Sequence, residues 1–167
     1  MERDPKLDAL VIRYGKQYGN CAQSSFLALQ DRFNLQCDVP SFVRALTAFP
    51  GIGGTGETCG GVSGTLLALG LALGPADPAD KEQSGKAHAA GHQFCSAVKK
   101  EFGSTDCGDI IERCCGRRFD LSNPLEAKQY AEAGGMMKCM NVVQTAVHIA
   151  AGILEDASNK GGKVQPK

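Results

Sequence analysis

Residues 49–74 read FPGIGGTGETCGGVSGTLLALGLALG. The glycine-rich loop at 51–56 is followed by Thr58, a residue type that commonly caps helices, so we expect a helix to begin at Cys59. The apolar run from Leu66 to Leu73 places large aliphatic side chains on most sides of that helix. A helix that is apolar on most sides is usually buried. This stretch therefore predicts a central helix with one cysteine at its start.

The glycines of this stretch recur at positions 56, 60 and 64, so they lie along one edge. A glycine inside a helix costs about 0.5–1 kcal/mol relative to alanine, mainly in backbone entropy. Such a cost indicates that something comes close along that edge. The occupant is either a ligand or another backbone, or the glycines simply allow close helix packing.

Working outward, helical periodicity alternates with capping signals along the rest of the chain. Asp4-Pro5 and Asn123-Pro124 each combine an N-cap residue with proline at the first helical position. No strand-like alternation of useful length is present, so we predict an all-α fold, an irregular bundle of about six to eight helices with the glycine-rich helix at its centre. The expected helices span about 5–18, 21–33, 38–49, 59–73, 80–102, from 107, 123–133, and a final one that includes 143–153.

The composition of the chain limits the classes of function that it can have. The 167 residues suit one helical domain, 1–157, with a flexible tail at 158–167. Lys+Arg and Asp+Glu both number 18, which leaves no basic excess for nucleic acid. The run from Val62 to Leu73 is shorter than the roughly 20 residues of a membrane span. Without an apolar leader at the start we expect a cytoplasmic protein whose eight cysteines bind metal, react or pack. The sequence leaves open whether the protein forms a homodimer.

Four of the cysteines share one placement: Cys21, Cys59, Cys107 and Cys139 each lie in or near the first turn of a predicted helix. The partial positive charge at a helix N-terminus stabilises a thiolate, and this setting commonly lowers the pKa of a cysteine. A thiolate is the form that binds metals and attacks disulfides. The spacings form no local Cys-x-x-Cys pair, so any cluster of these sulfurs must be made by the tertiary fold.

These cysteines stand in segments that resemble one known family: Gly19-Asn20-Cys21-Ala22-Gln23-Ser24, residues 56–64 around Cys59, residues 102–107 ending in Cys107, and Lys138-Cys139. The chain resembles the C-GCAxxG-C-C family of redox-active proteins, from about Leu7 to Leu154. The resemblance implies that the family cysteines are Cys21, Cys59, Cys107 and Cys139. The family is also similar to the framework of split-Soret cytochromes. This sequence has no Cys-x-x-Cys-His, so covalently attached c-type haem is not expected.

Three functions remain open. In the first, all four cysteines bind an iron–sulfur cluster or a transition metal for electron transfer with an unidentified redox partner. In the second, Cys59 is the attacking thiolate of a thiol–disulfide protein and another of the four resolves it. In the third, a non-catalytic helical binding or assembly module uses its cysteines only for packing.

The remaining candidates carry weaker signals. Cys114 shares a helix face with Cys107 but lies about 10 Å along the axis, so packing is its expected role. His88, His92 and Cys95 stand at i, i+4 and i+7 and could present three metal ligands on one face. That face is turned away from the predicted core, so we expect a solvated surface there, and the role of this trio is left open.

Overall fold

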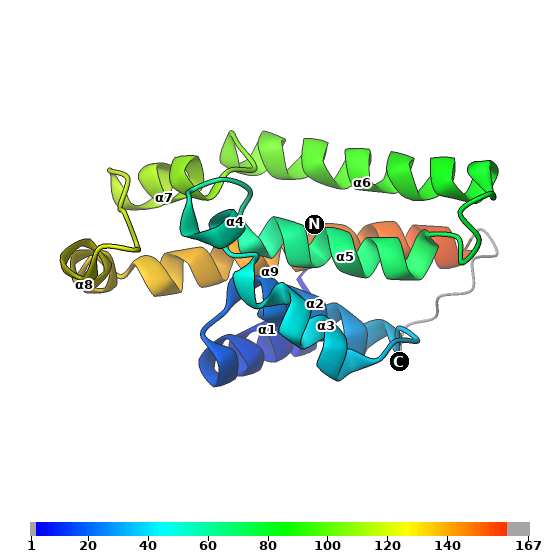
Figure 1. The fold of residues 1–167 in the computed structure, drawn as a ribbon, viewed down its shortest axis with the longest axis horizontal. Helices are drawn as coiled ribbons and strands as arrows, with labels where there is room; N and C mark the ends of the chain where they lie inside the picture. The colour runs from blue at the N-terminus through cyan, green and yellow to red at the C-terminus, as the bar shows by residue number, and fades with distance from the viewer. Residues whose placement is uncertain (1–2, 160–167) are drawn as a thin grey trace.

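The structure, a computed structural model, describes residues 3–159 and is all-α, as predicted (Figure 1). Eight helices account for most of this part of the chain, with the four-residue segment α4 and one 3-10 turn, η1. The elements are α1 (Pro5–Tyr18), α2 (Cys21–Phe33), α3 (Val39–Ala45), η1 (Leu46–Ala48), α4 (Gly51–Gly54), α5 (Gly60–Leu73), α6 (Lys81–Phe102), α7 (Cys107–Cys115), α8 (Pro124–Glu132) and α9 (Gly135–Asn159).

The turn between α1 and α2 follows the predicted capping chemistry. Gly19 ends α1 with a φ of 63°, a left-handed conformation that glycine adopts without steric cost. The Asn20 side chain then accepts hydrogen bonds from the backbone N–H groups of Ala22 and Gln23, both at 3.0 Å. Together the two residues set the position of Cys21 as the first residue of α2.

Helix α5 is central, as the sequence indicated. It lies between α6 on one side and the α1–α3 group on the other, with α9 alongside (Figure 1). A Cβ on Gly64 would fall on the carbonyl oxygen of Ala22, and one on Gly60 would fall on the sulfur of Cys21. At Gly60 and Gly64 the backbone of α2 therefore comes close to α5, which favours close helix packing over a ligand along this edge. Gly56 does not belong to the edge: it precedes α5, has a φ of 88° and lies beside Gly108 of α7.

Helix α9 is the second core helix, and it packs against α1, α2, α5 and α6. Among the described residues it is the one helix that is long and apolar enough to cross a membrane. Of its most apolar stretch of 18 residues, 56% is buried inside the fold. Val143, Val147, Ala150 and Leu154 are almost fully buried. Packing within the bundle therefore accounts for its apolar composition.

Three local expectations need correction. Helix α5 begins at Gly60, with Cys59 at its N-cap, because Thr58 is held in an isolated β-bridge with Asp106. The single helix expected over 38–49 is divided into α3 and η1, so that Leu46 is buried while Phe49, at the end of the segment, is 37% exposed. The predicted tail began at residue 158, whereas α9 continues to Asn159; residues 160–167 lie outside the described part of the chain.

Two glycines of α5 give a matched test of the packing. We expect Gly64→Ala to destabilise the protein by about 1–3 kcal/mol, because the added methyl group meets the backbone of α2. We expect Gly70→Ala, where nothing lies within 4 Å of the added carbon, to stabilise it by about 0.5–1 kcal/mol. Urea unfolding of both variants measures the difference. Equal effects at the two positions would contradict the close-packing interpretation.

Candidate functional site

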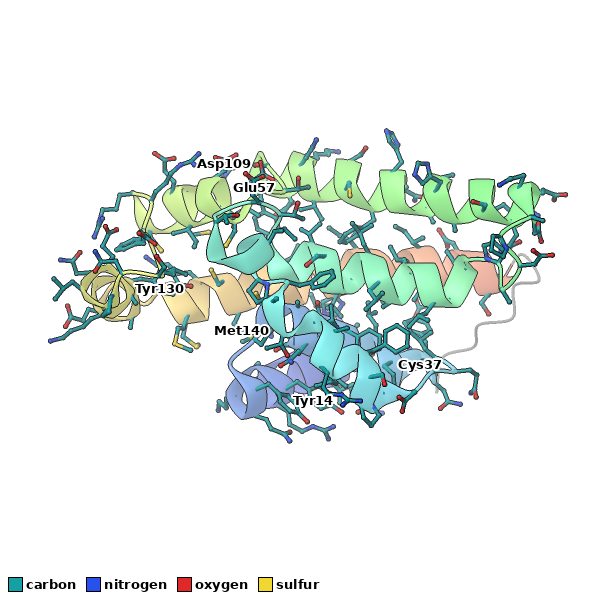
Figure 2. The ribbon with its side chains drawn as sticks, in the orientation of Figure 1. Tyr14, Cys37, Glu57, Asp109, Tyr130 and Met140 are labelled. Atoms are coloured by element: carbon teal, nitrogen blue, oxygen red, sulfur yellow. The ribbon has the colours of Figure 1, made fainter. Side chains whose placement is uncertain are left out.

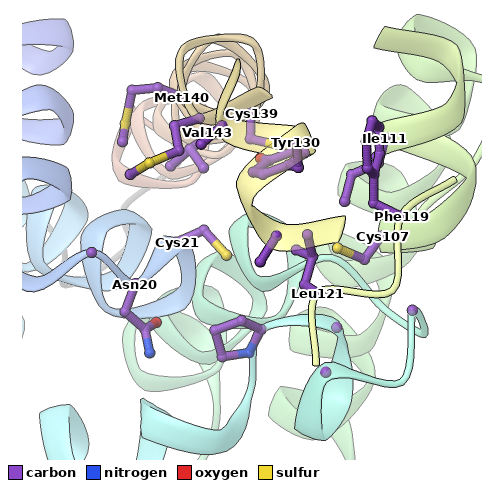
Figure 3. A pocket seen from close by; sticks show the side chains of 18 of the residues that line it. Asn20, Cys21, Cys107, Ile111, Phe119, Leu121, Tyr130, Cys139, Met140 and Val143 are labelled. Atoms are coloured by element: carbon purple, nitrogen blue, oxygen red, sulfur yellow. The ribbon is translucent and has the colours of Figure 1, made fainter. Parts of the chain in front are cut away.

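Three of the four predicted cysteines line one cavity of about 440 Å³ at the end of the bundle where the starts of α2, α7 and α9 meet (Figure 3). Cys21, Cys107 and Cys139 stand on its wall, and Cys59 is buried nearby with 6% exposure. Each of the four lies within electrostatic range of others in the set: Cys107, for example, interacts with Cys59, Cys21 and Cys139. The structure therefore brings together the residues that the sequence placed at four separate helix starts.

A short backbone clip joins the starts of α5 and α7. The N–H of Cys59 donates to the carbonyl of Thr105 at 2.8 Å, and the N–H of Cys107 donates to the carbonyl of Glu57 at 2.7 Å. A third bond runs from the N–H of Gly108 to the carbonyl of Gly56 at 2.8 Å. Because the two cysteine residues themselves donate, the clip fixes Cys59 and Cys107 relative to each other.

Two glycines lie beside sulfurs of the group. A Cβ on Gly51 would make only an ordinary contact with the sulfur of Cys107, at 3.6 Å, but its φ of 57° is one that other residues rarely adopt. Gly60 leaves room for the sulfur of Cys21, as described above. The segments before and after Cys59 therefore each pack against another cysteine of the group.

The rest of the cavity wall is largely apolar: its polar side chains, apart from the cysteines, are those of Asn20 and Tyr130, and none of its lining residues is Asp, Glu, Lys, Arg or His. Large side chains come from Ile111, Phe119, Leu121, Met140 and Val143 (Figure 3). Such a wall lowers the local dielectric constant and disfavours an isolated charge. The wall residues themselves therefore offer no opposite charge to a thiolate in this cavity.

The pKa values of the thiols show this effect. Burial raises the pKa of Cys21 to about 11 and of Cys59 to about 12, and mutual repulsion between the sulfurs adds to it. The N–H groups of Gly61 and Val62 act on Cys59 in the opposite direction, without forming a conventional side-chain cap. The expectation that helix starts lower these pKa values is wrong, because desolvation outweighs the effect of the helix N-terminus.

The pKa values of Cys107 and Cys139 are raised for the same reasons. Burial and the neighbouring sulfurs raise the pKa of Cys107, and burial raises that of Cys139 to about 11. Interaction with the Tyr130 hydroxyl lowers the pKa of Cys139 and so acts against this shift. No feature of the sequence indicates Tyr130, since its approach to Cys139 depends on how α8 folds against α9.

Cys114 is closer to the group than its position in the sequence suggested. It packs half-buried against the core, as expected, and also lies within electrostatic range of Cys59 and Cys139. Along α6, His88 and His92 are exposed and Cys95 is half-buried. Among residues 3–159, no three His, Cys, Asp or Glu side chains are grouped so as to hold a metal ion as they stand.

Comparison with known proteins gives the family. A family model described as "Putative redox-active protein (C_GCAxxG_C_C)" matches residues 19–153, which include all four cysteines. The chain belongs to this family. The chain is also similar to an uncharacterized protein from Archaeoglobus fulgidus. The two are 26% identical over 164 residues, which cover 93% of this chain and 98% of the relative. No solved structure matched.

The raised thiol pKa values predict how the metal-free, reduced protein responds to pH. An unfolded thiol has a pKa of about 8.5, whereas Cys21 and Cys139 titrate at about 11 in the fold. Above about pH 8.5 the unfolded chain loses protons that the folded protein keeps, so the free energy of unfolding should fall as pH rises towards 11. Urea unfolding across this range measures the slope.

The control is the double variant Cys21→Ala/Cys139→Ala. Without these two thiols the alkaline loss of stability should be smaller than in the natural protein. Identical slopes for the two proteins would show that the thiols are not buried as described.

Proposed function

We propose that Cys21, Cys59, Cys107 and Cys139 hold a redox-active metal centre, an iron–sulfur cluster in preference to a single ion, and that the protein transfers electrons. The observation that carries this proposal is the convergence of four cysteines from separate helix starts at one apolar cavity. The family description supports the redox part of the proposal.

The donor set fits such a centre. Four thiolates are the usual ligands of iron–sulfur clusters and also suit soft tetrahedral metals. A single tetrahedral ion with metal–sulfur bonds of about 2.3 Å needs its sulfurs within roughly 3.8 Å of one another. In the described residues no three His, Cys, Asp or Glu side chains are placed to hold a single metal ion, and the cavity measures about 440 Å³. A centre of several atoms, which spreads its ligands farther apart, suits this arrangement better.

The chain's own residues would bind and insulate the centre. Cys21, Cys107 and Cys139 would approach from the cavity wall, and Cys59 from its buried position beside them. Because these thiols are protonated in the metal-free protein, binding would release their protons. The apolar wall would limit access of water to the sulfurs. When bound, an iron–sulfur cluster supplies one-electron transfer.

The other two functions have less support. An attacking thiolate at Cys59 requires a lowered pKa, and burial raises it. Packing alone does not account for three thiols on the wall of a cavity, since packing cysteines are normally enclosed by neighbouring side chains.

Purification without oxygen tests the proposal. We expect coloured protein with stoichiometric iron and acid-labile sulfide, and loss of both in Cys107→Ser, because the smaller and harder oxygen replaces a sulfur ligand. Cys37→Ser, at a cysteine outside the cavity wall, is the matched control and should keep the iron. Iron analysis and absorption spectroscopy are the measurements. Four free thiols with no bound metal after anaerobic iron and sulfide reconstitution would refute the proposal.

A further inference from the structure

Residues 117–133, which comprise the loop after α7 and all of α8, form one side of the cavity. Five side chains of this segment line the cavity: Phe119, Leu121, Ala127, Tyr130 and Ala131. The wall cysteines stand on α2, α7 and α9 instead. On its other side the segment faces solvent, since Leu125 is 73% exposed and Lys128 is exposed as well. The segment lies at the left end of the molecule, where Figure 2 labels Tyr130, and it separates the cavity from solvent there.

The apolar attachment of this segment to the bundle is small. Among the described residues, the hydrophobic core takes no side chain from 117–133, and α8 packs mainly against α9. Tyr130 is the single buried residue of α8. A Cβ on Gly135, the first residue of α9, would fall on the Tyr130 ring, so the start of α9 is shaped to receive this ring. The Tyr130 ring is therefore the main apolar attachment of α8.

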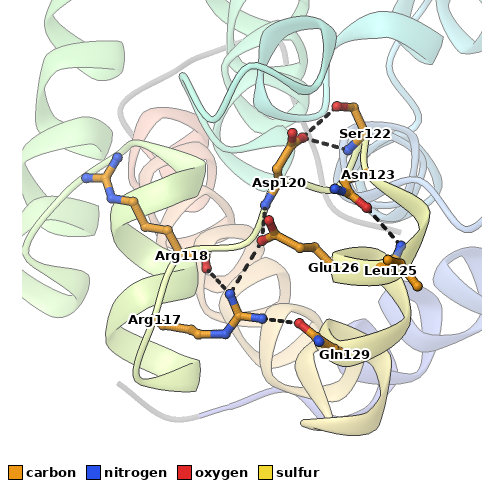
Figure 4. Close-up of polar contacts among 8 residues, drawn as sticks. All are labelled: Arg117, Arg118, Asp120, Ser122, Asn123, Leu125, Glu126 and Gln129. Carbon is orange, nitrogen blue, oxygen red and sulfur yellow. Dashed lines mark hydrogen bonds and ion pairs between the residues drawn. The ribbon is translucent and has the colours of Figure 1, made fainter.

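Polar contacts hold the segment together internally (Figure 4). Arg117 pairs with Glu126 at 3.4 Å and also donates to Gln129. Glu126 accepts a hydrogen bond from the N–H of Asp120 at 2.9 Å. The Arg117 guanidinium also lies over the Phe119 ring, 3.9 Å from its centroid. Because these contacts join the loop to α8, we expect the two parts to move as one unit.

One charged side chain ties the segment to the rest of the protein. Among the described residues, Arg118 is the one charged side chain of 117–133 that pairs outside the segment, with Glu112 of α7 at 3.0 Å and with Asp109. The Arg118 side chain is 61% exposed, so these ion pairs are solvated and contribute little to stability. The polar attachment is therefore weak as well.

A glycine with a left-handed backbone stands at each end of the segment. Gly116 has a φ of 85° and Gly134 a φ of 70°. At neither position would an added Cβ have a neighbour within 4 Å beyond the adjoining residues, so neither glycine is packed against the bundle. Glycine reaches backbone angles that other residues rarely adopt, and a few residues at the ends of an element serve as hinges. The segment therefore has two points about which it can turn without disturbing the core.

We propose that residues 117–133 are a hinged cover of the cavity, which turns about Gly116 and Gly134 to admit molecules to the thiols and closes to exclude water. Closure of this kind sequesters a site from solvent. The gating of the cavity rests on the attachments described above. The further step, that iron and sulfide reach the four cysteines through the open cover, rests on the function proposed above.

The test compares Arg118→Gln with Lys128→Gln in the full chain. Both substitutions remove one positive charge, and neither residue lines the cavity. Lys128 pairs with Glu132 on the same helix, so its loss leaves the contact with α7 intact. The readout is the rate at which Cys21, on the opposite wall, reacts in reduced, metal-free protein. Small iodoacetamide and the wider, rigid pyrene maleimide are the two reagents, and mass spectrometry follows the products.

Arg118→Gln should speed the reaction of Cys21 about threefold with both reagents, because it removes the exposed ion pairs that favour the closed cover. Lys128→Gln should leave both rates unchanged. A third variant, Tyr130→Ala, should speed both reactions at least about tenfold, since it removes the main apolar attachment. A hole left by the missing ring would speed only the small reagent. Unchanged rates with pyrene maleimide in Arg118→Gln and Tyr130→Ala overturn the proposal.

Urea provides a check on the natural protein. Below the unfolding transition, urea should change the rate at which Cys21 reacts with pyrene maleimide only slightly, because opening a cover exposes little surface. A rate that rises in step with global unfolding overturns the cover, since the thiols would then be reached only through the unfolded chain.

A separate measurement addresses the metal centre. In protein reconstituted with iron and sulfide, ferrozine should remove iron faster from Arg118→Gln than from Lys128→Gln or the natural protein, because the cover opens more often. If the natural protein takes up no cluster, the metal function fails while the alkylation result still stands. If it takes up a cluster and all three proteins release iron at one rate, the role of the cover in loading is overturned.

Discussion

The arrangement of the site depends on the backbone clip between residues 56–59 and 105–108. Its three hydrogen bonds join the start of α5 to the start of α7, two helices separated in sequence by the whole of α6. Backbone hydrogen bonds constrain both the distance between two segments and their relative orientation. The clip therefore places Cys59 and Cys107 at the same end of the bundle, and close packing of α2 on α5 adds Cys21 to them.

Glycine makes that packing possible, and the same glycines shape the site. Gly60 lies where the sulfur of Cys21 and the backbone of α2 approach α5, and Gly64 continues the contact one turn later. Gly135 plays the equivalent part for the Tyr130 ring at the start of α9. At each position a methyl group would occupy volume that another group already fills. The entropy that glycine costs is offset by contacts that no larger residue allows.

Burial gives the cysteines their chemical character. In an apolar cavity without charged side chains, four neighbouring thiols stay protonated, since each thiolate would be poorly solvated and would repel the others. A cationic centre would remove both penalties at once. The same physics that makes Cys59 a poor free nucleophile makes the group as a whole a suitable acceptor for a positively charged metal centre.

Local residue chemistry determined the helices and the positions of the cysteines along them. Gly19 and Asn20 end one helix and cap the next, so Cys21 at a helix start could be read directly, and an apolar α5 had to be central. Tertiary structure alone decided that the four cysteines converge, that burial raises their pKa values, and that Tyr130 reaches Cys139. Capping and periodicity act over a few neighbouring residues. Convergence, desolvation and the Tyr130 contact instead depend on distances between segments far apart in the chain, which only helix packing sets.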